Sequence, residues 1–155
     1  LLIALALIED QQALLICNGY KDRRYIETAI LARRLGHQPV VVIEQADEIQ
    51  RIIEASKELG ASPFIGIRAK LSSRSTGHWG SSVGSRAKFG LDLSEMLHTV
   101  QALGEAGLLQ DLRLLHFHIG SQINDIARMP PAPGGVVNGI EMLDVIVRPQ
   151  ALLCC

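Results

Sequence analysis

The stretch Val40-Val-Val-Ile-Glu44 decides the fold, because an unbroken β-branched run leads directly into a carboxylate. β-branched side chains favour extended backbone, and a continuous apolar run indicates a strand that is covered on both faces. Such strands belong to parallel sheets with helices packed against them. The segment therefore predicts a buried parallel strand with Glu44 at its carboxyl end.

Three other segments are expected to form strands of the same sheet. They are residues 13–18, 63–70 and 112–119, so the strand starts lie near 13, 39, 63 and 112. Each is a short apolar run that ends in a polar or charged side chain. The polar groups at the four strand ends are Asn18, Glu44, Arg68 and His118.

Helical spacing fills the gaps between these strands. Asp22 is the expected N-cap of the first helix, and Asp92 with Glu95 forms a capping box at the start of the third. A glycine is expected to end each helix. The third helix is expected to bury Leu93, Met96, Leu97, Val100 and Leu103.

Strands that alternate with helices pair in parallel through right-handed crossovers, which defines an α/β fold. Either an open doubly wound sheet or part of a (β/α)₈ barrel fits this order. The polar strand ends favour a partial barrel of about four strands, because barrel sites gather at the carboxyl ends. We expect residues 1–125 to form this domain and residues 126–155, which include Pro130-Pro-Ala-Pro133, to be an irregular tail.

Composition narrows the classes of function. The 155 residues suit one domain, and 15 Lys and Arg against 16 Asp and Glu give a net charge of -1. This balance predicts neither a nucleic-acid partner nor an acidic membrane surface. Cys17, Cys154 and Cys155 lack zinc-ligand spacing, so a reducing, cytoplasmic setting is expected.

The chain begins at Leu1 with an apolar run of eight residues, too short for a membrane span and without the basic start of a signal peptide. We interpret this run as the end of a core helix. An opening inside a helix leads us to expect that the chain is a piece of a longer protein.

The segment Leu114-Leu-His-Phe-His-Ile-Gly-Ser-Gln122 carries the strongest functional signal. Side chains alternate along a strand, so His116 and His118 share one face. Where the strand turns, Ser121 offers a hydroxyl beside backbone donors, which suits a phosphate. A histidine pair satisfied inside a core explains the same residues equally well.

Other groups could serve the same site. Arg68 could hold a phenolate or carboxylate by directed hydrogen bonds, although an exposed arginine at a strand end is common. The polar loop 71–87 carries Trp79 between two glycines and could close over a ligand or simply be a surface loop. Lys88 follows it and could place a cation near the site.

Zinc is the main alternative ligand, because barrel hydrolases also hold the metal with two histidines on one strand face. His116 and His118 would need further ligands, for which His78, Glu44 and Asp125 are candidates. No second cluster has metal spacing, so no metal site is predicted. A glycine-rich dinucleotide fingerprint and a Walker loop are both absent from the sequence.

Several stretches together resemble the biosynthetic arginine decarboxylases, a family of fold-type-III enzymes that use pyridoxal phosphate. The order and spacing of these stretches match the family from about residue 1 to residue 124. The matching stretches are Ile16-Cys-Asn-Gly-Tyr-Lys-Asp22, Ile65-Gly-Ile-Arg-Ala-Lys-Leu71, Gly77-His-Trp-Gly80, Lys88-Phe-Gly-Leu91 and Leu114-Leu-His-Phe-His-Ile-Gly-Ser-Gln122.

The resemblance implies an alanine-racemase-like barrel and roles for particular residues. His118 would stack on the pyridine ring of the cofactor, Ser121 would bind its phosphate, and Arg68 would steady both cofactor and histidine. His116 and Lys88 would support them. It further implies conversion of L-arginine to agmatine and carbon dioxide in polyamine biosynthesis, a homo-oligomeric enzyme, and possible use of Mg²⁺.

The resemblance also sets limits. In the family, the Schiff-base lysine lies on an earlier strand, and neither Lys21 nor Lys70 stands in the motif of that lysine. No catalytic residue is therefore assigned, and we expect the chain alone neither to close a barrel nor to decarboxylate arginine. The alternatives are a non-catalytic carrier of pyridoxal phosphate and the zinc-dependent barrel hydrolase.

Overall fold

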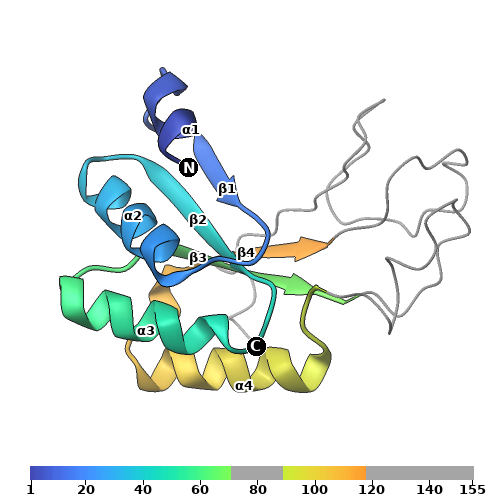
Figure 1. Ribbon diagram of the computed structural model, residues 1–155. Coiled ribbons are helices and arrows are strands. Elements are labelled where there is room, and N and C mark those ends of the chain that lie inside the picture. The colour runs from blue at the N-terminus through green and yellow to red at the C-terminus, as the bar shows by residue number, and fades with distance from the viewer. Residues whose placement is uncertain (71–88, 118–155) are drawn as a thin grey trace, which may run out of the picture.

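The computed structural model describes residues 1–70 and 89–117, which form a single parallel sheet with helices (Figure 1). Every strand expected from the sequence is present, and each begins within one residue of its expected start. The elements in chain order are α1 (Leu2–Leu7), β1 (Leu14–Cys17), α2 (Arg23–Arg34), β2 (Gln38–Ile43), α3 (Glu48–Leu59), β3 (Phe64–Ala69), α4 (Leu93–Glu105), the 3₁₀ turn η1 (Leu109–Asp111) and β4 (Leu112–Phe117).

The sheet has the order β1-β2-β3-β4, and all of its neighbours are parallel. Helices α2, α3 and α4 lie on one face of it (Figure 1). A doubly wound sheet reverses its strand order and carries helices on both faces, whereas a barrel keeps sequential order and carries its helices outside. The described residues therefore form part of a (β/α) barrel, as the sequence predicted.

The two faces of the sheet carry separate apolar clusters, since side chains alternate along each strand. On the outer face, Val41 and Ile43 of β2 pack with buried residues of α2 and α3, including Ile30 and Ile52. On the inner face, Val40, Val42 and Leu114 form a smaller cluster together with Ile16 and Phe64. The inner face is the one that would line a barrel.

The helix starts confirm the capping predictions. Asp22 accepts a hydrogen bond from the Tyr25 amide at the start of α2. Asp92 and Glu95 form a reciprocal capping box at the start of α4. These bonds satisfy amide groups that the first turn of a helix leaves without partners.

Two burial predictions were wrong. Leu93 and Leu97 of α4 are 72% and 62% exposed, because the helix turns Leu103, as expected, and Thr99 toward the sheet. The run at the chain start is helical, but α1 has no buried residue, and Leu2, Ile3 and Leu7 are all exposed. Apolar spacing identified these helices without fixing which side faces the sheet.

Gly66 lies close to its neighbouring strands on the inner face. A Cβ at Gly66 would lie 3.1 Å from Leu114 and 3.2 Å from Val42, closer than ordinary contact. Gly66→Ala is therefore expected to lower the free energy of unfolding by about 1–3 kcal/mol through overpacking. Urea denaturation of the purified chain measures this change.

Gly104→Ala is the matched control, because a Cβ there meets nothing within 4 Å on the exposed side of α4. Replacing a helical glycine in open space should raise stability by about 0.5–1 kcal/mol. If both variants changed stability equally, close packing at Gly66 would not be what requires glycine.

Candidate functional site

Three polar side chains stand in a row where strands β2, β3 and β4 end. Glu44, Arg68 and His116 each follow an inner-face residue by two positions, so alternation directs all of them to the inner face. The parallel register places Arg68 beside His116. On its other side, Arg68 Nη1 lies 3.1 Å from Glu44 Oε2. We call these residues the strand-end row.

The row is largely shielded from water. The Glu44 side chain is fully buried and the Arg68 side chain is 16% exposed, while His116 is 2% exposed as a residue. A buried carboxylate is costly unless it is paired and hydrogen-bonded, and Glu44 has both kinds of partner. Its Oε1 accepts a hydrogen bond of 2.8 Å from the Gly19 amide.

Glu44 also links the segments around the row through its backbone. Its carbonyl oxygen accepts a hydrogen bond of 2.8 Å from the Gly90 amide. Gly90 has φ +97°, a conformation that favours glycine, and the next residue continues the connection because the Leu91 amide donates to the carbonyl of Arg68. One residue therefore ties together the ends of β1, β2 and β3 and the segment that leads into α4.

A second buried ion pair lies behind the row. Lys21 Nζ is 3.1 Å from Glu48 Oε1, and both side chains are fully buried. The ammonium group also donates to the carbonyl oxygens of Gly19 and Val42, which gives a partner to each of its N–H groups. Glu48 Oε2 in turn accepts hydrogen bonds from the amides of Glu44 and Gln45.

This second pair has a structural role. The Lys21 amine is occupied by the carbonyls of two strand ends and by Glu48, so it holds the turn after β1 against the turn after β2. Lys70 is different, since it is partly exposed and lies 3.8 Å from Glu95 of α4. Neither arrangement leads us to assign a catalytic lysine.

Cys17 lies at the end of β1 but has little nucleophilic character. Burial raises the pKa of its thiol, and the neighbouring Tyr25 and Lys21 lower that pKa to a smaller extent. Because a thiolate is the reactive form, a raised pKa leaves the thiol neutral and unreactive near neutrality. Among the described residues Cys17 is a free, buried cysteine that packs at the strand end.

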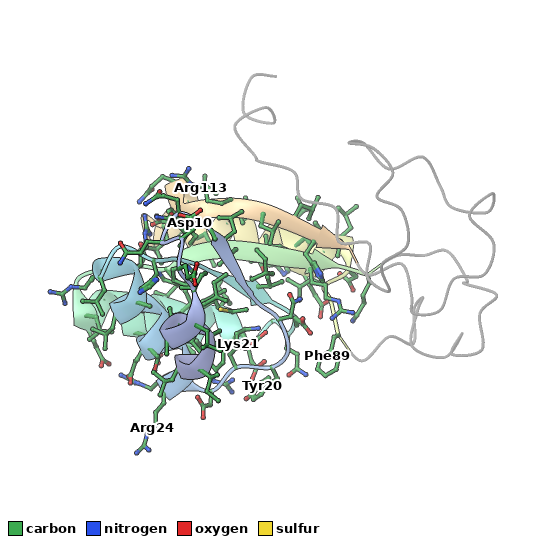
Figure 2. The ribbon with its side chains drawn as sticks, turned by 90° about the horizontal axis from the view of Figure 1, so that it is seen from above. Asp10, Tyr20, Lys21, Arg24, Phe89 and Arg113 are labelled. Carbon is green, nitrogen blue, oxygen red and sulfur yellow. The ribbon has the colours of Figure 1, made fainter. Side chains whose placement is uncertain are left out.

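The opposite end of the sheet carries a different cluster. Arg33 donates to the Ser62 carbonyl and to Asp111 Oδ1 at 2.8 and 2.7 Å, and its guanidinium lies over the Phe64 ring. Figure 2 shows Arg113, which also lies over Phe64, at the other end of the domain from Phe89. These contacts close the amino ends of the strands, where barrels place stabilising interactions.

The structure brings together two of the site residues predicted from the sequence, Arg68 and His116. His118, Ser121 and Lys88 lie outside the described residues, so their roles stay predictions. His78 and Asp125, considered as zinc ligands, lie outside them too. Within residues 1–70 and 89–117, no three side chains suited to a metal ion gather, and no helix is long and apolar enough to cross a membrane.

The buried pair of Lys21 and Glu48 was not predicted from the sequence. Both residues are charged and adjoin helix starts, where exposed side chains are the usual expectation. The sequence carried a weak signal that Glu48 could be buried. Glu44 and Glu48 lie four residues apart, one at a strand end and the other at a helix start. Only the packing of α3 against the turn after β1 shows that Glu48 faces inward.

Comparisons with known proteins define the class. The family described as pyridoxal-dependent decarboxylase, pyridoxal binding domain, matches residues 1–144. The chain therefore belongs to this family of pyridoxal-binding domains.

Individual relatives are similar over much of the chain. It is 76% identical over 132 residues to the biosynthetic arginine decarboxylase of Parasynechococcus marenigrum, an alignment that covers 85% of this chain and 20% of that protein. The enzyme of the same name from Synechococcus sp. (strain RCC307) is 73% identical, with 85% and 21% covered. The chain thus spans about a fifth of the length of these relatives.

A solved structure supports the same family. The biosynthetic arginine decarboxylase of Campylobacter jejuni superposes with a TM-score of 0.65 at 35% identity. The match covers 79% of this chain and 18% of that one. This likeness supports the partial barrel fold of the described residues.

The Lys21–Glu48 pair predicts a large effect of one substitution. Lys21→Met leaves a buried carboxylate without its cation, so the free energy of unfolding should fall by about 3–5 kcal/mol. Lys57→Met makes the same change at an exposed position of the same domain and should cost less than about 1 kcal/mol. Urea denaturation of both variants measures the difference, and equal losses would contradict a stabilising role for the pair.

Proposed function

We propose that this chain forms cofactor-binding strands of a pyridoxal-phosphate-dependent arginine decarboxylase. Its sequence identity of 76% to a relative with that name carries the proposal. The strand-end row supports it, because the row sets a cation and an imidazole at the barrel edge where such sites lie.

The residues present fit an anionic aromatic cofactor. Arg68 offers a planar guanidinium whose donors suit phosphate or phenolate oxygens, and it is held from one side by Glu44. His118 would stack on the ring and Ser121 would donate to the phosphate, with His116 and Lys88 as supporting groups. When bound, pyridoxal phosphate supplies an electron sink for the electrons released as the carboxylate leaves.

The chain's own part in such a reaction is binding and orientation. The buried Glu44 fixes Arg68, and the neighbouring strand fixes His116 beside it. Groups held on strands by packing keep their geometry better than groups on loops, which limits misplacement of a bound cofactor. We propose L-arginine as substrate, agmatine and carbon dioxide as products, and a place in polyamine biosynthesis.

The proposal also covers the oligomeric state and the cellular location of the enzyme. We propose a homo-oligomeric enzyme on the family resemblance alone, and a cytoplasmic setting because Cys17 is a free, buried cysteine. Use of Mg²⁺ rests on family resemblance alone. Among the described residues at this edge, Glu44 and Glu48 are already engaged by Arg68, Lys21 and backbone amides.

Family membership favours pyridoxal phosphate over the zinc alternative. Arg68 beside His116 points the same way, because a guanidinium is a poor neighbour for a cation and a good one for a phosphate. A non-catalytic carrier would share the pocket, and substrate turnover distinguishes it from a decarboxylase.

A chimeric enzyme tests the proposed function. The 132-residue segment aligned with the Parasynechococcus marenigrum relative replaces its counterpart in that full-length protein. We expect the chimera to bind pyridoxal phosphate and to release agmatine and carbon dioxide from L-arginine, because the grafted strands supply an equivalent site. A folded chimera that binds cofactor without turnover would favour the carrier reading.

Arg68→Met in the same chimera tests the cofactor contact. Loss of charge-assisted hydrogen bonds, which contribute about 1.5–3 kcal/mol each, should raise the dissociation constant for pyridoxal phosphate about 10-fold to 100-fold. Titration followed by cofactor absorbance measures this change. The control is Arg24→Met, which removes an exposed arginine of α2 that points away from the domain (Figure 2) and should leave the constant unchanged.

A further inference from the structure

We propose that Glu44 is a positioning residue that sets the direction of Arg68 for the cofactor. This role rests on the proposed function, since Arg68 needs a fixed direction only if it faces a ligand. The observation that carries it is a fully buried carboxylate 3.1 Å from one terminal nitrogen of that guanidinium.

Arg68 has a different neighbour on each side in the strand-end row. Glu44 holds it from the β2 side, and His116 stands at the matching register position on β4. In the part of the chain described, Glu44 is the only residue that forms an ion pair with Arg68. A fork of five N–H donors can engage a carboxylate with one corner and still present other donors to a phosphate or phenolate.

Glu44 is itself held too firmly to follow a moving arginine. Its Oε1 accepts from the Gly19 amide, its own amide donates to Glu48 Oε2, and its carbonyl accepts from Gly90. Glu48 is fixed in turn by Lys21. The carboxylate is therefore a rigid reference point, and the arginine takes its direction from it.

We expect the charge of Glu44, rather than the size of its side chain, to set the direction of Arg68. Glu44→Gln keeps the length of the side chain and an oxygen that can accept from the Gly19 amide, but it removes the attraction for Arg68. Glu58→Gln is the matched control, because it removes the charge of an exposed glutamate that pairs with Arg23. Exposed pairs contribute little, so the control should behave as the unsubstituted protein does.

The test uses the chimeric holoenzyme in a double-mutant cycle. Glu44→Gln should lower kcat about 10-fold to 100-fold with little change in KM, and should alter the visible circular dichroism of the bound cofactor, which reports its orientation. In the Arg68→Met background the same substitution should have no further effect on either readout, because its action passes through Arg68. Glu44→Asp, which keeps the charge, should recover part of kcat.

Two results would overturn the role. One is a Glu44→Gln enzyme that matches Glu58→Gln in kcat and dichroism, and the other is an equal loss of kcat with and without Arg68. If the Glu44→Gln enzyme does not fold, Glu44→Asp replaces it in the double-mutant cycle. The role then requires that Glu44→Asp has no further effect in the Arg68→Met background. An unsubstituted chimera that binds no cofactor would instead refute the proposed function, and this role with it.

Discussion

The neutralisation of buried charge at the carboxyl ends of the strands is the constraint on which the rest of the site depends. Glu44 and Glu48 are buried carboxylates, and each is paired with a cation and with backbone amides. Removing either cation, Arg68 or Lys21, would leave an uncompensated charge in a medium of low dielectric constant. The turns after β1 and β2 and the end of β3 are therefore held in a single arrangement.

The two buried ion pairs at this edge of the sheet have different roles. The Lys21–Glu48 pair fixes the backbone at the ends of β1 and β2, because Lys21 donates hydrogen bonds to carbonyl oxygens there. The Glu44–Arg68 pair holds a side chain at the end of β3 on the inner face. Membership in the pyridoxal-binding family gives this second pair its proposed purpose, because an anionic cofactor requires a directed cation.

Much of the architecture could be predicted from local sequence. The β-branched run before Glu44 marked a buried parallel strand, and Asp22, Asp92 and Glu95 marked helix starts, since capping and backbone preference act over a few residues. Burial was harder to predict. Leu93 and Leu97 have the spacing of a core face yet are exposed, because the rotation of α4 is set by its contacts with the sheet.

The sequence by itself determined the alternation of strands and helices, the polar groups at the strand ends, and the resemblance of its motifs to a decarboxylase family. The tertiary structure alone decided that α2, α3 and α4 cover one face, and that Glu44, Arg68 and His116 form a row. Local preferences act between near neighbours along the chain. Pairing of Glu44 with Arg68, and of Lys21 with Glu48, joins residues far apart in sequence and exists only once parallel register brings the strand ends together.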